Sequence, residues 1–463
     1  MRGRVHNREP TVKSLHLKSA YVVLLIAAFA TFCCSRLRAI VLKRGETAVL
    51  ARFTAPDSCE ALLRLRVSAP VDWSDSSRVS ALLRVELDGR RSHDVLVPVA
   101  RFASATFLGP VASGFHDVSV SLDATYTAPA VREVRIVEAR VRCVRPGDSL
   151  YTVLAHAPYL YGRPGNEHSD APLLMWYERT AGNQQQRILY SVIWSNEDGG
   201  TDTPDLLSRW GRTTDIEWIA EVFLGASERV DSVLFQAPGH ETTRFRGRWR
   251  GAHPVLRTCT LNNNVCDHDT SEFLFALAPL RTRAPDQPRE ALMDAEPWTY
   301  YVMAAELKRE GKLEPVPDPS TPQPGDLHDY LFIDFGTAGD WSDVDFVFSL
   351  QTADGRWFAS NHGLDSVQCV NAPGWRRTSV ELPHGFTLSD LRRLRLQARA
   401  DQAFSVRVLG ISRLFQLDGA WQPVTYPWTW SEPFELTNQR PWREWELLNP
   451  RELTETSAAR AGE

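Results

Sequence analysis

The acidic residues between Trp194 and Trp218 form the part of this sequence best suited to chemistry. Asp215 and Glu217 flank a single isoleucine, so on a β-strand both side chains would leave the same face, about 7 Å apart along the chain. Two carboxylates at such a separation can act in general acid–base catalysis or bind a divalent cation through oxygen. The alternative is a polar strand face on which these carboxylates pair with Arg209 or Arg212.

Residues 196–202, with the sequence NEDGGTD, resemble a calcium loop, and Asp198 and Asp202 are its candidate metal ligands. The spacing of an EF-hand is not met, because the acids do not recur at alternate positions and no terminal glutamate follows. Two glycines after an acid are also typical of a turn with positive φ. No cofactor is predicted, and a divalent cation such as calcium is left open as an alternative.

Histidines form the second set of candidates. We take His156 as the third candidate catalytic residue, and Arg212, Trp210, Trp218 and His253 as candidate binding residues. A zinc or iron site would need three converging ligands, and no HxxxH or HxH pair fixes even two of them. The alternative for each histidine is a surface or hydrogen-bonded residue.

Several classes of chemistry are excluded by the sequence. It contains neither a GxSxG nucleophile elbow nor the glycine-rich motifs that cradle phosphates, so nucleotide chemistry is not expected. The nearly balanced net charge of −5 argues against nucleic acid or a strongly anionic surface as the main partner. Fifteen tryptophans fit either rigid aromatic packing or a surface on which a ligand stacks.

The cysteines suggest at least one disulfide, which an oxidising compartment permits. Cys259 and Cys266 bracket a short polar loop and form the most favourable disulfide pair. Cys59 and Cys143 lie near the two ends of one strand-rich segment and are a second candidate pair, which leaves Cys369 over. No CxxC motif is present, so a zinc ribbon or a thioredoxin-type site is not supported.

The elements that must position these residues are mainly β-strands. Residues 40–147 alternate apolar and polar side chains between regularly spaced turns, which predicts an antiparallel β-sandwich. Residues 148–314 are less regular and predict a central β-rich α+β domain with two helices. The first helix has Thr203 as its N-cap and Gly211 at its end, and the second begins at Trp298.

The C-terminal part repeats the strand-rich pattern. Residues 315–325 hold five prolines and predict a linker or wrapping arm without regular structure. Residues 326–420 predict a second β-sandwich-like domain, and residues 421–463 a C-terminal tail. The predicted fold class is therefore mainly β.

The N-terminus, residues 1–39, reads as a signal peptide or signal anchor. Basic residues precede an apolar run from Ala20 to Cys34, whose helical rise of roughly 22 Å is short of the ~30 Å core of a bilayer. This length and flank are typical of a signal peptide. We therefore expect an extracytoplasmic protein in the periplasm, at the cell surface or secreted, with membrane contact through this segment alone.

Two groups of residues carry a family resemblance. The first comprises His156–Tyr161 and Asp170–Leu173, and the second Trp210–Trp218 and Gly251–Pro254. Together they resemble an uncharacterised family of exported bacterial proteins. The central region is also distantly similar to vacuolar-protein-sorting-related proteins of plants and fungi, whose name implies trafficking. This resemblance supports one unit over about 150–290 and supplies no catalytic residues.

These observations favour an exported, non-enzymatic protein whose β-sandwich modules bind a glycan or another envelope polymer. The alternative hypothesis is an extracytoplasmic hydrolase, metal-assisted or not, that uses Asp215 and Glu217 with His156 or His253. The two hypotheses differ in one geometric expectation. A hydrolase requires both carboxylates and a histidine to converge in a cleft, whereas a structural role pairs the carboxylates with Arg209 or Arg212. The oligomeric state is not set by the sequence.

Overall fold

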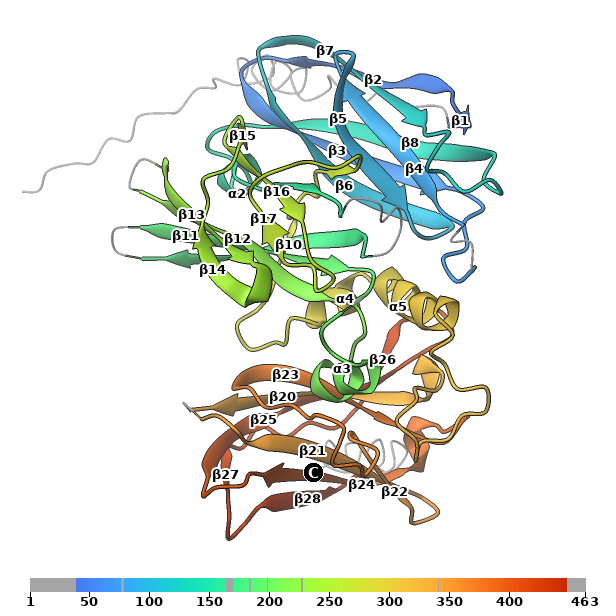
Figure 1. Cartoon of the computed structure of the whole chain (residues 1–463), viewed down its shortest axis with the longest axis vertical. Helices are drawn as coiled ribbons and strands as arrows, with labels where there is room; N and C mark the ends of the chain where they lie inside the picture. The colour runs from blue at the N-terminus through green and yellow to red at the C-terminus, as the bar shows by residue number, and fades with distance from the viewer. Residues whose placement is uncertain are drawn as a thin grey trace, which may run out of the picture.

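The computed structural model describes residues 39–75, 79–163, 170–182, 185–197, 199–225, 228–339 and 341–447. These residues build five sheets and a few short helices, which confirms the predicted mainly β class. Figure 1 shows an N-terminal sandwich, a central layer and a C-terminal sandwich stacked along the long axis of the molecule. The leader, apart from Ala39, lies outside the described residues. None of the helices described is long and apolar enough to cross a membrane.

The N-terminal sandwich encloses the first core. One sheet has the order β1, β8, β3, β6, and the other contains β5, β4, β7 and β2 in that order. Alternation places Leu63, Leu65 and Val67 of β3 inside, at most 2% exposed, and leaves Arg64 and Arg66 exposed on the other face. The strands are β1 (Ile40–Lys43), β2 (Thr47–Ala55), β3 (Cys59–Ser68), β4 (Ala81–Leu87), β5 (Arg90–Val97), β6 (Arg101–Val111), β7 (Gly114–Leu122) and β8 (Glu133–Val144).

The second sheet of this sandwich continues into the central region. Beyond β5 it adds β18, β9, β16 and β15, with β17 paired to β16. Phe275 lies opposite Asp94, and the backbone amide of Leu274 donates a 2.9 Å hydrogen bond to the Asp94 carboxylate. The sheet therefore crosses the boundary that we predicted at residue 147. These strands are β9 (Tyr159–Tyr161), β15 (Trp249–Arg250), β16 (His253–Thr258), β17 (Val265–Cys266) and β18 (Leu274–Phe275).

A separate six-stranded sheet forms the body of the central region. Its order is β14, β13, β12, β11, β10, β19, and all its neighbours are antiparallel except β10 and β19. Met175, Tyr190 and Val222 are buried on it and share a core with Leu62 and Phe107 of the N-terminal sandwich. The strands are β10 (Pro172–Ala181), β11 (Gln186–Trp194), β12 (Ile216–Leu224), β13 (Val230–Ala237), β14 (Glu241–Arg244) and β19 (Arg281–Thr282).

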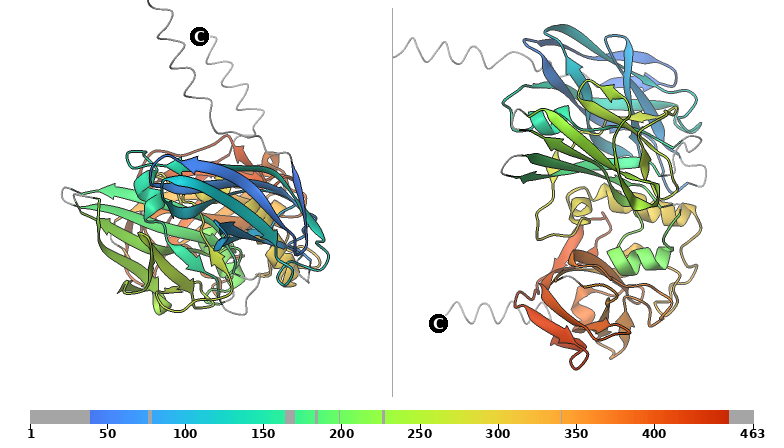
Figure 2. Two further views of the ribbon diagram at one scale, coloured as in Figure 1. Left: turned by 90° about the horizontal axis from the view of Figure 1, so that it is seen from above. Right: turned by 60° about the vertical axis from the view of Figure 1, so that its left-hand side comes forward.

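Short helices connect these sheets to the C-terminal sandwich, as the two views of Figure 2 show. Helix α3 begins with Asp202 as its N-cap rather than Thr203, and it ends at Gly211, whose φ of 59° favours glycine. The helices are α2 (Tyr151–Ala155), α3 (Thr203–Trp210), α4 (Ala291–Ala295) and α5 (Trp298–Arg309), with 3-10 turns η1 (Pro238–His240), η2 (Leu327–Asp329) and η3 (Leu388–Asp390).

The C-terminal sandwich is larger than the sequence predicted. Its sheets have the orders β23, β20, β25, β26, with β27 also paired to β25, and β22, β21, β24, β28. The predicted tail from residue 421 was therefore wrong as far as residue 447, because β26, β27 and β28 complete both sheets. The strands are β20 (Tyr330–Ala338), β21 (Asp345–Thr352), β22 (Trp357–Ala359), β23 (Gly374–Glu381), β24 (Leu391–Arg399), β25 (Ser405–Leu417), β26 (Pro423–Tyr426), β27 (Phe434–Thr437) and β28 (Trp442–Glu446).

The proline-rich residues 315–325 contain no helix or strand. They nevertheless make defined contacts, since the Glu314 amide donates to the Pro324 carbonyl at 2.9 Å. The Pro319 carbonyl also lies 3.1 Å from Nδ1 of His362. The segment therefore packs against the C-terminal sandwich as a wrapping arm.

A buried arginine joins the C-terminal sandwich to the helices. Arg377 on β23 is 0% exposed and donates to both Asp334 oxygens, at 2.6 and 3.0 Å. The same guanidinium donates to Asp294 at 2.8 Å and to the Tyr300 hydroxyl at 2.6 Å. Breaking a buried pair of this kind leaves uncompensated charge, so this contact fixes the two parts of the molecule relative to each other.

Candidate functional site

Asp215 and Glu217 lie together where β12 begins. Asp215 is the last residue before the strand, and its carbonyl accepts a 2.9 Å hydrogen bond from the Trp194 amide of β11. Asp215 is only 2% exposed, and the Glu217 side chain is 15% exposed. A third carboxylate, Glu197, reaches the same place from the segment after β11 and accepts from the Thr201 amide at 2.9 Å. We call Glu197, Asp215 and Glu217 the acidic cluster.

Burial and mutual repulsion keep protons on this cluster near neutral pH. Burial, followed by the charge of Glu217, raises the pKa of Asp215 to about 7. Burial and the charge of Asp215 likewise raise the pKa of Glu197 to about 7. The pKa of Glu217 is also raised, chiefly by burial. The three groups therefore exchange protons as a coupled set.

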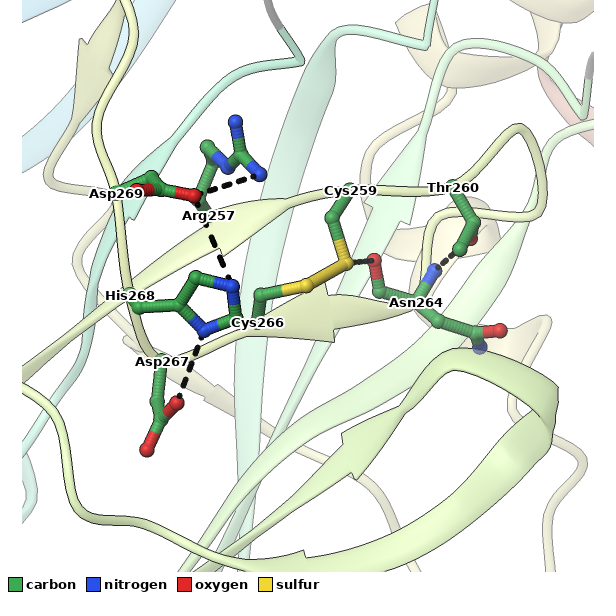
Figure 3. Close-up of a disulfide and its surroundings, with 8 residues drawn as sticks. All are labelled: Arg257, Cys259, Thr260, Asn264, Cys266, Asp267, His268 and Asp269. Atoms are coloured by element: carbon green, nitrogen blue, oxygen red, sulfur yellow. Dashed lines mark hydrogen bonds and ion pairs between the residues drawn. A yellow bond between two sulfur atoms is a disulfide. The ribbon is translucent and has the colours of Figure 1, made fainter.

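The loop closed by the Cys259–Cys266 disulfide lies over the acidic cluster. The predicted disulfide is present, with its Cα atoms 6.0 Å apart, and Figure 3 shows the loop around it. The Cys259 amide donates to the Asn264 carbonyl at 2.9 Å, which closes the loop next to the disulfide. Asn263, fully buried, donates from Nδ2 to Asp215 at 3.0 Å and to the Asn196 carbonyl at 3.1 Å. The disulfide thereby holds an amide against the most buried carboxylate.

His240 lies beside the exposed edge of the cluster. Its Nδ1 is 3.8 Å from Glu217 and 2.5 Å from Nε2 of Gln236, and its Nε2 is 2.8 Å from Nδ2 of Asn262. The residue has a φ of 60° at the end of the turn η1. We did not predict it as a site residue, because nothing in the spacing of His240 relates it to Glu217.

The two arginines proposed as partners take different roles. Arg212 is 2% exposed and donates from Nε to Glu290 at 3.0 Å, while its charge lowers the pKa of the acidic cluster against the effect of burial. Arg209 points to the C-terminal sandwich, where it donates to Gln368 at 2.9 Å and to Asn371 at 3.2 Å. Neither arginine hydrogen-bonds to Asp215 among the contacts described.

The two predicted histidines lie elsewhere, in a buried cluster at the sandwich boundary. His253 is 0% exposed, with Nε2 at 3.2 Å from Glu60 and Nδ1 at 2.8 Å from the Ala157 carbonyl. Its ring stacks on Phe107 with centroids 4.7 Å apart. Burial lowers the pKa of the adjacent His156, so this imidazole is neutral at neutral pH. The structure thus separates His156 and His253 from the acidic cluster.

The remaining predicted site residues are dispersed. The guanidinium of Arg209 lies 4.2 Å from the Trp210 ring and that of Arg212 5.3 Å, and Trp210 and Trp218 are both half-buried. Asp202 is exposed at the start of α3, and Asp198 lies outside the described residues. Within the part of the chain that the structure describes, no three histidine, cysteine or acidic side chains are placed to hold a metal ion.

The second predicted disulfide is not formed. Cys59 and Cys143 are free thiols that lie within hydrogen-bonding distance of each other. Burial and this hydrogen bond raise the pKa of Cys59 to about 12. Register explains the difference, because Cys143 lies opposite Ala61 and meets Cys59 only diagonally across β3 and β8. Cys369 is also a free, buried cysteine.

An aromatic ledge lies on the outer face of the C-terminal sandwich. We define it as Trp357 on β22, Arg395 on β24 and Trp442 on β28. The Arg395 guanidinium is 4.4 Å from the Trp357 ring centre and 5.4 Å from that of Trp442. Arg395 is held by Glu444 at 2.8 Å, and Trp442 is 54% exposed.

The sequence carried a signal for this ledge that we did not use. In WREWE, residues 442–446, alternation points Trp442 and Glu444 to one face while Trp445 is buried in the core. The charges around the ledge balance, because Arg393 pairs with Glu444 at 3.0 Å and with Glu446 at 3.5 Å, so that two arginines face two carboxylates. The ledge therefore offers stacking surfaces and planar hydrogen-bonding groups without net charge.

Comparison with known proteins does not assign a family. Neither a protein-family model nor a curated protein matches the sequence. Among solved structures, a sugar-binding protein described as the EclA C-terminal domain is 11% identical over 24% of this chain and 81% of its own, with a TM-score of 0.18. NLPPya in complex with mannosamine is 12% identical over 29% of this chain and 73% of its own, with a TM-score of 0.22.

A third similar structure is a family two carbohydrate esterase from Clostridium thermocellum in complex with cellohexaose. It is 14% identical over 29% of this chain and 34% of its own length, with a TM-score of 0.16. TM-scores this low support no inference about the function of this chain.

Proposed function

We propose that this chain is an extracytoplasmic, non-enzymatic protein that binds a neutral glycan of the cell envelope on the aromatic ledge. The observation that carries the proposal is the pair of tryptophan rings flanking Arg395 on an exposed sheet face. Rings of this kind present large, rigid, amphipathic surfaces at low entropic cost. The basic and apolar N-terminal segment and the Cys259–Cys266 disulfide support the compartment.

The ledge has the chemistry that sugar recognition needs. The apolar C–H face of a pyranose ring can stack on Trp357 or Trp442, and the guanidinium and carboxylate between them can hydrogen-bond to hydroxyl groups. Arg395 and Glu444 are fixed by their own ion pair, which reduces the side-chain entropy lost on binding. Gln397 lies opposite Trp442 on the neighbouring strand and adds an amide to the same face.

The test combines a broad array of neutral glycans with titration calorimetry on the purified protein. We expect saturable binding, weakened at least about tenfold in W357A/W442A, because two stacking rings are removed. W249A is the matched control, since Trp249 is 45% exposed on β15 in the central region. Absence of any bound glycan, or equal weakening by W249A, would contradict the proposal.

A second candidate function is a hydrolase that uses the acidic cluster. It is favoured by the pKa values of about 7 for Asp215 and Glu197, which suit proton transfer at neutral pH. Hydrolysis of the bound glycan that is lost in both D215N and E217Q would support it. A glycan that stays uncleaved during incubation with the protein would exclude hydrolysis of that glycan.

A further inference from the structure

Two adjoining cavities lie on the outer face of the sheet formed by β1, β8, β3 and β6. Their volumes are about 560 Å³ and about 520 Å³, and both are lined by Arg66, Phe102 and Ala103. We call this pair of cavities the arginine groove. A volume of this size is typical of a ligand site.

The arginine groove is strongly basic. Two acids, Glu138 and Glu296, face six arginines there, namely Arg64, Arg66, Arg101, Arg135, Arg140 and Arg281. The chain as a whole carries a net charge of −5, so positive charge is concentrated at this place. A concave surface lined by one sign of charge attracts ligands of the opposite sign.

Half of these arginines have no neutralising partner among the described residues. Glu138 lies 2.6 Å from Arg140 and 3.6 Å from Arg66, and Glu296 lies 2.5 Å from Arg281. Among the residues that the structure describes, no ion pair or side-chain hydrogen bond engages the other three, which are exposed: Arg64, Arg101 and Arg135. Their donors are therefore free to receive an anionic group.

The opposite wall of the groove comes from the central region. Leu173 and Leu174 of β10 and Trp298, the first residue of α5, line the larger cavity. The Trp298 ring meets Phe102 edge-on at 5.2 Å, and its Nε1 donates to Glu296 at 3.0 Å. The larger cavity therefore pairs a basic wall with an apolar and aromatic one, whereas the smaller cavity is lined by β3, β6 and β8 alone.

The positive charge extends along the strands rather than around a point. Arg64 and Arg140 face each other across β3 and β8, and Arg101 and Arg135 both lie opposite Ser68 at the other end of β3. Four residues of strand correspond to about 13 Å. An extended ligand with repeated charges matches this spread, whereas a single small anion would engage only one end.

We infer that the arginine groove binds an anionic polysaccharide whose uronate carboxylates are received by Arg64, Arg101 and Arg135. The planar guanidinium fork matches a carboxylate in bidentate geometry, and all the groove cations are arginines. Leu173 and Trp298 provide the apolar contact for the sugar rings. The inference is independent of the aromatic ledge, which lies on the other sandwich.

Two other polyanions fit the groove less well. A flat bilayer surface cannot enter the larger cavity, which lies between two walls, and would reach only the smaller one. Single-stranded nucleic acid needs a series of aromatic platforms. Among the described residues that line the groove, the aromatic rings are Trp298 and the buried Phe102, which meet edge-on. Binding of a bilayer and binding of single-stranded nucleic acid are both measured in the experiment below.

The experiment titrates the purified protein with a hexamer of galacturonic acid and with the same hexamer fully methyl-esterified, which is neutral. We expect the acid form to bind at least about tenfold more tightly, with the affinity falling as salt is raised. In R64Q/R101Q/R135Q the affinity should fall roughly 100-fold, at about fivefold for each arginine. Because these residues are exposed and unpaired, the variant should keep its unfolding midpoint.

The matched control is R90Q/R244Q/R407Q, which removes the same charge from exposed positions elsewhere. It should leave the binding of the hexamer within about twofold of that of the unmodified protein. The inference is overturned by equal binding of the acid and the ester, by equal weakening in both triple variants, or by no binding. Stronger binding of oligo-dT or of phosphatidylglycerol vesicles also overturns it. W357A/W442A should not affect the hexamer, which separates this site from the aromatic ledge.

Discussion

Replacing Asp215 with asparagine should stabilise the protein at alkaline pH, because the buried carboxylate opposes folding once it ionises. The pKa of this group rises from 3.8 to about 7 in the folded chain, through burial and the nearby Glu217. Each unit corresponds to about 1.4 kcal/mol, so ionisation of Asp215 costs the folded state about 4 kcal/mol above pH 7. Asparagine keeps the shape of the side chain and can still accept from Asn263.

The pH dependence follows from proton linkage. Between about pH 4 and pH 7 the folded chain binds more protons at Asp215 than the unfolded chain, so its stability falls as the pH rises through that window. We expect D215N to exceed the unmodified protein in free energy of unfolding by about 2–4 kcal/mol at pH 8 and by less than about 1 kcal/mol at pH 4.5. Urea unfolding followed by tryptophan fluorescence at both pH values measures this difference.

E290Q provides the opposite control. Although burial raises the pKa of Glu290, Arg212 and two further arginines lower it by more, so its charge stabilises the fold. Its removal leaves Arg212 buried without its 3.0 Å partner and should cost about 3–5 kcal/mol at pH 8. If D215N destabilised the protein at pH 8 as E290Q does, or changed stability equally at both pH values, the reasoning about the acidic cluster would be refuted.

Three further predictions concern the supports of this architecture. R377M should lower the free energy of unfolding by about 3–5 kcal/mol, because Asp334 and Asp294 lose their shared partner. R377K should recover part of this loss. An unchanged melting temperature of R377M would contradict the prediction. C259S/C266S should lower the free energy of unfolding by about 2 kcal/mol. It should also speed amide exchange in residues 260–264, as measured by hydrogen–deuterium exchange. Unchanged exchange would show that Asn263 alone holds the loop. G211A should lower the melting temperature, because the residue has a φ of +59° and an added Cβ would lie 2.7 Å from Cγ of Arg377; G419A, where nothing lies within 4 Å, is its control.

Local patterns predicted the elements better than they predicted the assembly. The alternation in β3 was sufficient to predict a sandwich, and the short spacing of Cys259 and Cys266 was sufficient to predict their disulfide. The last strands, β26 to β28, are only four or five residues long, so their alternation is too brief to be distinguished from a loop. The tail was mispredicted for that reason.

The candidate sites depend on contacts that spacing does not encode. Asp215 and Glu217 lie near each other because they share a strand end, but Asn263 and His240 reach them through a disulfide loop and a left-handed turn. The arginine groove was missed because its two walls are far apart in the chain. Leu173 and Trp298 come from segments more than 100 residues after Arg64.

The sheet shared by the N-terminal sandwich and the central region has a consequence for biogenesis. Strand β5 obtains its second neighbour only when Leu274 and Phe275 arrive, 180 residues later in the chain. When the chain emerges with its N-terminus first, one edge of β5 therefore stays unpaired until the residues up to β18 have followed. Such long-range pairing slows folding and leaves a template for wrong association. Expression of a fragment that stops before β18 should accordingly yield aggregates rather than a free-standing sandwich.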